Sequence, residues 1–167
     1  YIMDNHFKKV LCMQELIQGL KKAELHIHIE GSLEPQMMMD LALRNKIQLP
    51  YVNVSQIEQA YNFENLQSFL DLYYRGMSVL QTEQDYYDLM MAYLRKVSAQ
   101  NVVRAEIFFD PQGHLPRGIA WSTFMLGFER AINSARSELG IDGQLILCFL
   151  RHLPESDALR TFDAAME

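Results

Sequence analysis

Two histidines separated by one residue, His26 and His28, are the side chains of this sequence best suited to chemistry. Residues 23–29 alternate between apolar and polar side chains, which is the period of a strand. Both histidines therefore share one face, roughly 6.5 Å apart at ~3.3 Å of rise per residue. Two imidazoles at that spacing can converge on one Zn²⁺. The pattern predicts a metal-binding strand, although the pair alone also fits two histidines exposed on an edge strand.

The acidic residue Glu30 follows on the histidine face, at the C-terminal end of the same strand. The opposite face, from Leu25 to Ile29, is apolar and is expected to pack under covering helices. Active sites of parallel α/β proteins are built at the C-terminal ends of strands. After the strand, Ser32 can cap a helix that extends to about residue 45.

Further along the chain, hydrophobic periodicity predicts two more strands, each separated from the previous one by helices. Such alternation indicates a parallel sheet with helical crossovers, either an open sheet or the first part of a barrel. No repeat or linker divides residues 1–167, so we expect a single domain. The expected strands are 102–109 and 144–150, and the further helices are 7–20, 66–80, 82–97 (opened by a capping box at Thr82), 121–139 and 154–166.

Composition excludes several classes of protein. The net charge is −6 and the basic residues are scattered, which argues against nucleic-acid binding. No apolar run reaches membrane-spanning length, and residues 1–20 lack the core of a signal peptide. The two cysteines, Cys12 and Cys148, predict buried free thiols and no disulfide framework. We therefore expect a cytoplasmic protein.

Four segments carry a resemblance to a known family. KAELHIHIEGSLEP (22–35) is similar to the first-strand signature of the adenosine and adenine deaminases, which are zinc-dependent amidohydrolases. ENLQSFLDLYY (64–74) resembles the helix that walls their substrate pocket. VVRAEIFFDPQ (102–112) and LILCFLRHL (145–153) resemble their second and third strands. The resemblance implies the N-terminal portion of a (β/α)8 TIM barrel, with about three strands and the barrel not closed by this chain.

The resemblance also implies a function. Members of the family replace the 6-amino group of a purine by oxygen, and EIFFDPQ together with Glu30 favours the adenine branch. The implied reaction is zinc-dependent hydrolysis of adenine to hypoxanthine and ammonia, a step of purine salvage. His26 and His28 match two ligands of the single zinc ion. Glu30, Gly31 and Phe69 are the expected contacts to the purine base.

Other parts of the implied site are missing from these residues. The remaining ligands and the proton-shuttling His-Ala-Gly-Glu segment are expected beyond residue 167, so the chain alone is expected to be inactive. An adenosine or N6-substituted adenine deaminase is an alternative, and so is a non-catalytic metal-binding or oligomerising relative. The sequence leaves open whether the protein forms a homo-oligomer.

Several residues outside the main candidate site fit more than one role. His114, in a loop with glycine and proline, is expected at the surface or the rim. His152 is expected to make a structural hydrogen bond, with a position at the barrel mouth as the alternative. Asp110 and Gln112 follow the second strand and fit a functional role or a simple turn equally. Glu106 can face a polar interior or pair with an arginine, Arg104 or Arg151. Leu66, Phe69 and Tyr73 can line a pocket or serve helix packing.

Overall fold

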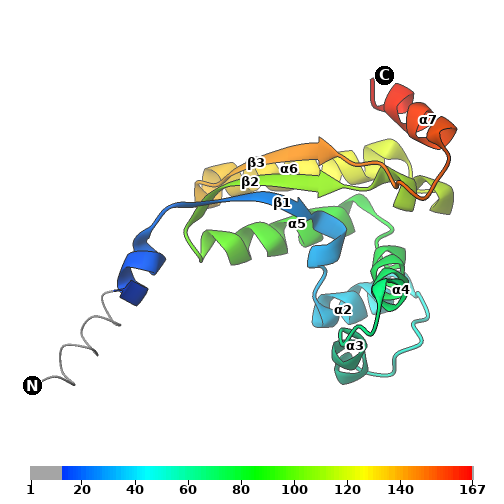
Figure 1. Ribbon diagram of the computed structural model, residues 1–167, viewed down its shortest axis with the longest axis horizontal. Helices are drawn as coiled ribbons and strands as arrows, with labels where there is room; N and C mark the ends of the chain where they lie inside the picture. Colours follow the sequence, from blue (N-terminus) through cyan, green and yellow to red (C-terminus); the bar gives the residue numbers. More distant parts are fainter. Residues whose placement is uncertain (1–12, 167) are drawn as a thin grey trace, which may run out of the picture.

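The computed structural model describes residues 13–166 and consists of a parallel sheet with helices around it (Figure 1). Three strands pair in the order β1-β2-β3, which is also their order in the sequence. Residues 13–19 are helical and precede the first strand. The elements are β1 (Lys22–His28), η1 (Ile29–Ser32), α2 (Pro35–Asn45), α3 (Val54–Ala60), α4 (Leu66–Ser78), α5 (Glu83–Ser98), β2 (Val102–Phe109), η2 (Pro111–Gly113), η3 (Leu115–Arg117), α6 (Trp121–Leu139), β3 (Asp142–Leu147) and α7 (Glu155–Met166).

Two crossovers join the parallel strands. The first contains α2 to α5 and the second is α6, and helices α5 and α6 pack against one another. Helices α2, α3 and α4 gather beyond the C-terminal end of β1, whereas α5 and α6 run alongside the sheet (Figure 1). The C-terminal end of the sheet is therefore flanked by helices that can close a site.

The two faces of the sheet differ in what covers them. On β2, Ala105, Ile107 and Phe109 are buried and belong to the core that α5 and α6 share. Register pairs Ile27 with Ile107 and His28 with the half-buried Phe108. Because neighbouring residues of a strand face opposite ways, the histidine face of β1 is the face that the helices leave uncovered. The expected alternation holds for His26 and His28, which share one face, but a register irregularity between Glu24 and Ile27 interrupts it and the strand ends at His28.

Most expected elements are confirmed, with a few corrections. Helix α3 was not expected; the Asn53 side chain caps it by accepting from the Gln56 backbone N–H at 3.0 Å. The prediction that Ser32 caps the next helix is wrong. Ser32 lies in the 3-10 turn η1 and donates to the Ile29 carbonyl at 2.7 Å, while α2 begins at Pro35. Proline is favoured at the first helical position because its fixed φ suits a helix, so α2 starts at Pro35 and not directly after Ser32.

Two apolar positions are more exposed than expected. Leu25 is 57% exposed, because it lies in the register irregularity between Glu24 and Ile27 and no described element covers it. Strand β3 is half-buried for most of its length, since no strand pairs with its outer edge among residues 13–166. Cys148 is a half-buried free thiol, while Cys12 lies outside the described residues. None of the described helices is long and apolar enough to cross a membrane.

Candidate active site

The histidines of β1 lie side by side on the uncovered face of the sheet. Their ring centroids are 5.6 Å apart, and both rings stack on Phe108 of β2, at 4.4 Å for His26 and 5.3 Å for His28. Phe108 thus supports both imidazoles from the neighbouring strand. No protein group hydrogen-bonds the His26 ring within the described part of the chain, so its nitrogens are free to bind a ligand.

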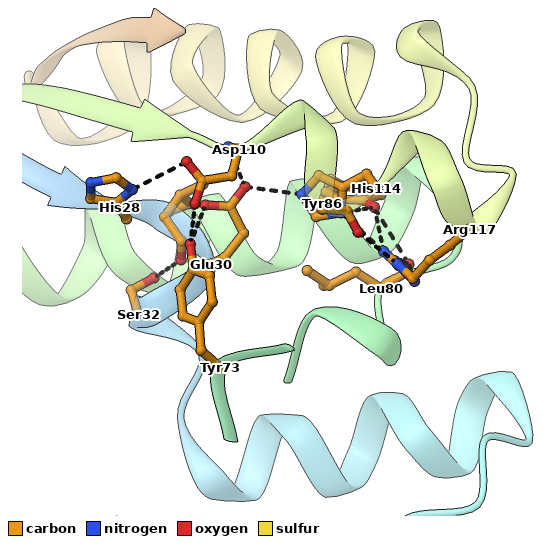
Figure 2. Close-up of polar contacts among 11 residues, drawn as sticks. His28, Glu30, Ser32, Tyr73, Leu80, Tyr86, Asp110, His114 and Arg117 are labelled. Atoms are coloured by element: carbon orange, nitrogen blue, oxygen red, sulfur yellow. Dashed lines mark hydrogen bonds and ion pairs between the residues drawn. The ribbon is translucent and has the colours of Figure 1, made fainter. Parts of the chain in front are cut away.

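A third and a fourth metal-type side chain approach His28. Its Nδ1 is 3.3 Å from Oδ1 of Asp110, which follows β2 (Figure 2). Ligand atoms of His28, Asp110 and Cys148 lie within 4.8 Å of one another. Burial and the negative charge of Asp110 raise the pKa of Cys148 to about 11, so its thiol is protonated at neutral pH. Imidazole and carboxylate are ordinary zinc ligands, and the donor set therefore fits this metal.

Glu30 does not lie on strand β1, contrary to the expectation from the sequence. The chain turns into η1 after His28, and the Glu30 carboxylate is 2% exposed beneath the C-terminal end of β2. Its Oε1 accepts the Asp110 backbone N–H at 2.9 Å and contacts His114 Nε2 at 2.9 Å. Glu30 therefore joins the end of β1 to the end of β2, which alternation along β1 could not indicate.

The position expected for His114 is wrong. Its side chain is 0% exposed and packs edge-on to Tyr86 at 5.1 Å and beside Phe124 at 5.5 Å. The turns η2 and η3 fold this loop onto α5 and α6, whereas glycine and proline in the sequence indicate only that a loop is present. A histidine buried among aromatic rings depends on long-range packing, so local sequence carried no signal for it.

Asp110 and Tyr73 connect helix α4 to the end of β2. The Tyr73 hydroxyl donates to Asp110 Oδ2 at 2.6 Å and lies 3.4 Å from Glu30 Oε2 (Figure 2). Burial, and then the negative charges of Glu30 and Asp110, raise the pKa of Tyr73 well above its ordinary value. The hydroxyl thus stays protonated and donates between two buried carboxylates.

Gly31 and Phe69 line a small cavity beside Glu30. The cavity has a volume of about 30 Å³ and is enclosed also by Leu72 and Tyr73, enough space for one water molecule. Phe69 is 39% exposed and stacks on Tyr73 at 5.9 Å. The structure therefore brings the three expected substrate residues to one cavity, whereas Leu66 is largely exposed.

The remaining candidates, Gln112, Glu106 and His152, differ in their contacts with the rest of the protein. Gln112 is buried, and its Oε1 accepts the Leu150 backbone N–H at 2.7 Å, which fixes the segment after β3. Glu106 pairs with Arg104 at 3.1 Å. His152 is exposed and contacts the edge of the Tyr74 ring at 6.3 Å; no hydrogen bond of its side chain occurs within residues 13–166, contrary to the expectation.

The sequence of this chain is similar to those of known proteins. The chain is 56% identical over 154 residues to a protein of Trichlorobacter lovleyi named adenine deaminase, covering 92% of this chain and 44% of that protein. It is 54% identical over 155 residues to the adenine deaminase of Vibrio parahaemolyticus, covering 93% and 46%. The chain thus spans less than half the length of these curated relatives.

Solved structures support the fold. The adenine deaminase of Arthrobacter aurescens superimposes with a TM-score of 0.84 at 46% identity, over 86% of this chain and 44% of that one. The expected fold class is thereby confirmed: the described strands and helices form the N-terminal portion of a (β/α)8 barrel, and the described sheet is not closed. An amidohydrolase crystallised with bound Zn has the same fold, with a TM-score of 0.77 at 22% identity.

A family model agrees with the individual likenesses. The model described as adenosine deaminase matches residues 21–166. This range includes the three strands β1, β2 and β3, the two histidines of β1, and Glu30 with its contacts to Asp110 and His114. That match extends over most of the sequence, and the relatives above share more than half of their aligned residues with it. The chain belongs to the adenosine deaminase family.

Proposed function

We propose that this chain is the N-terminal part of an adenine deaminase, which hydrolyses adenine to hypoxanthine and ammonia. The observation that carries the proposal is the 54–56% identity to relatives named adenine deaminase. The 46% identical structure of the Arthrobacter aurescens adenine deaminase supports it. Purine salvage and a cytoplasmic location belong to the same proposal, and a homo-oligomer is compatible with it.

The metal of the proposed site is one Zn²⁺, held in this chain by His26 and His28. The support is geometric: two imidazoles on one strand face, with the Asp110 carboxylate 3.3 Å from one of them. When bound, zinc lowers the pKa of water toward ~7 and so supplies a nucleophile at neutral pH. Phe108 stacks on both rings and keeps them oriented.

The purine base would bind next to Glu30, Gly31 and Phe69. An aromatic face at Phe69 suits stacking with a planar base, and the Glu30 carboxylate suits one of its N–H groups. The described cavity of about 30 Å³ is far smaller than a purine. The rest of the pocket, together with the residues that transfer protons, would come from the part of the protein that the relatives have beyond the matched region.

The proposal is tested with a full-length protein that carries this chain. It is purified with zinc, and ammonia release is measured with adenine, adenosine and N6-methyladenine. We expect kcat/KM to be highest for adenine. A clear preference for adenosine or for N6-methyladenine would assign the protein to another branch of the family. A folded, zinc-loaded protein without turnover on any of the three would favour a non-catalytic relative.

A further inference from the structure

A buried line of polar side chains runs from Glu30 through His114 to Arg117 (Figure 2). His114 Nε2 lies 2.9 Å from Glu30 Oε1, and His114 Nδ1 lies 2.9 Å from Arg117 Nη2. The Tyr86 hydroxyl is 3.0 Å from the same Nδ1. Glu30 and His114 are almost completely buried, so these contacts are shielded from water. Buried polar groups joined in this way hold one another in a fixed arrangement.

The partner of Nδ1 determines where His114 carries its proton. A guanidinium group only donates hydrogen bonds, so Nδ1 must accept from Arg117. The ring proton therefore sits on Nε2 and is donated to Glu30 Oε1. Arg117 cannot easily turn away, because its Nη1 donates to the Leu80 carbonyl at 3.2 Å and its Nε to the Gly113 carbonyl at 3.0 Å.

This arrangement treats the two oxygens of Glu30 differently. Oε1 accepts two N–H groups, from the Asp110 backbone and from His114, each at 2.9 Å. Within residues 13–166, the hydrogen-bond partner of Oε2 is only the Tyr73 hydroxyl, at 3.4 Å, and that hydroxyl donates to Asp110 at the shorter distance of 2.6 Å. Oε2 therefore keeps its capacity to accept a hydrogen bond next to the cavity that Gly31 and Phe69 line.

We propose that His114 is a positioning residue for recognition of the purine base. Held as the Nε2–H tautomer by Arg117, it fixes Oε1 of Glu30 so that Oε2 faces the cavity and accepts an N–H of the base. An unsubstituted purine has such an N–H on its five-membered ring, and a nucleoside has a glycosidic bond in its place. The inference rests on the proposed function, since it assumes that the base binds beside Glu30.

Kinetics of two His114 variants test the proposal in the full-length, zinc-loaded protein. His114→Leu keeps much of the volume and removes both polar atoms. His114→Gln retains an N–H donor for Glu30 and a carbonyl acceptor for Arg117. We expect the leucine variant to raise KM for adenine about tenfold, as for loss of one hydrogen bond to a charged group. Its kcat should stay within about threefold, and glutamine should restore most of the KM.

Tyr86→Phe is the matched control, because it removes the other contact to Nδ1 and leaves that of Arg117. We expect it to keep the KM of the unaltered protein. A merely structural role for His114 would lower the active fraction, and with it the apparent kcat, and would leave KM unchanged. An unchanged KM in His114→Leu, or equal KM losses in the leucine and glutamine variants, would overturn the proposal.

A second measurement decides the matter if the leucine variant does not fold. In the unaltered protein labelled with ¹⁵N-histidine, the signals of His114 are assigned by their loss in His114→Gln. We expect the proton on Nε2, and a proton on Nδ1 would overturn the proposal. If the unaltered full-length protein does not release ammonia from adenine, the proposed function fails, and the tautomer still reports separately on the hydrogen-bond arrangement.

Discussion

Tyr73 donates a 2.6 Å hydrogen bond to Asp110, which links helix α4 to the C-terminal end of strand β2. The two residues are 37 positions apart in the sequence and come from different sides of the site. Asp110 also faces His28, so the same carboxylate touches the histidine strand and the helix that carries Phe69. The tyrosine hydroxyl therefore connects Asp110, which faces His28, to the helix that lines the cavity.

Removing that hydroxyl with Tyr73→Phe should destabilise the chain. Asp110 is 2% exposed and would lose its shortest hydrogen bond. Leaving a buried acceptor short of a partner costs about 1–3 kcal/mol. Urea unfolding of the purified chain, followed by circular dichroism, measures the change in the free energy of unfolding.

Tyr74→Phe is the matched control for Tyr73→Phe, because Tyr74 is the next residue of the same helix. Its hydroxyl makes no hydrogen bond within residues 13–166, so we expect a loss below about 0.5 kcal/mol. Equal losses in both variants would mean that the bond between Tyr73 and Asp110 contributes nothing specific.

The buried carboxylate of Asp85 should dominate stability in the first crossover. It is 0% exposed and accepts the backbone N–H groups of Gln81 and Thr82 and the side chains of Asn45 and Arg44. Asp85→Asn keeps the shape and removes the charge. We expect a loss of about 2–3 kcal/mol at pH 7, on the scale of hydrogen bonds to a charged group.

The pH dependence of this effect follows from the pKa of Asp85. Burial raises that pKa, but the hydrogen bonds from Gln81, Thr82 and Asn45 outweigh burial and lower it below the ordinary value of 3.8. A pKa lower in the folded state stabilises the fold above the unfolded-state value, and the stabilisation is lost as the pH falls through the folded-state value.

The difference between Asp85→Asn and the unaltered chain should therefore be constant above about pH 5 and shrink below about pH 4. Urea titrations from pH 3 to pH 7 measure it. Asp88→Asn is the control, since Asp88 also pairs with Arg44 but is partly exposed, and should cost less than about 1 kcal/mol. A difference that grew toward acid pH would contradict the assignment.

The framework of this fold was predictable because it depends on local patterns. Strand β2 covers the same residues, 102–109, that were expected from the sequence, and the capping box at Thr82 opens α5 as expected. The left-handed conformation of Gly140 ends α6 where the glycine stop was expected. Each of these features is determined by a few neighbouring residues.

The connections within the site were not predictable in the same way. Alternation along β1 put His26 and His28 on one face, and the structure agrees. The contact between Glu30 and His114 joins residues 84 positions apart, and it depends on two short 3-10 turns that place a loop histidine in the core. Neither spacing nor periodicity encodes a contact of that kind.

The 167-residue chain, with His26 and His28 as its zinc ligands, should bind zinc weakly and support no turnover. In the purified 167-residue chain we expect ammonia release from adenine far below the ~1 s⁻¹ at the lower end of ordinary enzyme rates. Catalytic zinc needs three protein ligands, and the pair supplies two with Asp110 nearby. Competition with a colorimetric chelator measures the zinc affinity, which His26→Ala and His28→Ala should each lower.

His152→Ala is the control for the zinc measurement, because His152 is exposed and contacts only the edge of Tyr74 among the described aromatic rings. It should leave the zinc affinity unchanged. Zinc binding that survived both alanine substitutions in β1 would place the metal elsewhere, and turnover at ordinary enzyme rates would show that the chain needs no further residues.

Gly127 should be intolerant of alanine although it lies within helix α6. Alanine is normally about 1 kcal/mol better than glycine in a helix interior. A Cβ at this position, however, would lie 2.5 Å from the Glu83 carbonyl oxygen and 2.8 Å from the Tyr86 Cβ. Both atoms are held by the backbone of α5 and cannot move without it, so Gly127→Ala must push α5 and α6 apart. We expect a net loss of about 1–3 kcal/mol in urea unfolding.

Gly76→Ala in helix α4 provides the comparison for Gly127→Ala. There the nearest atom to an added Cβ is the end of the Leu33 side chain at 3.4 Å, which can rotate away. This variant should be neutral or more stable by up to about 1 kcal/mol. Because helix preference acts equally at both positions, opposite signs would isolate the close approach of α5 and α6, and a stabilised Gly127→Ala would show that the two helices have room to separate.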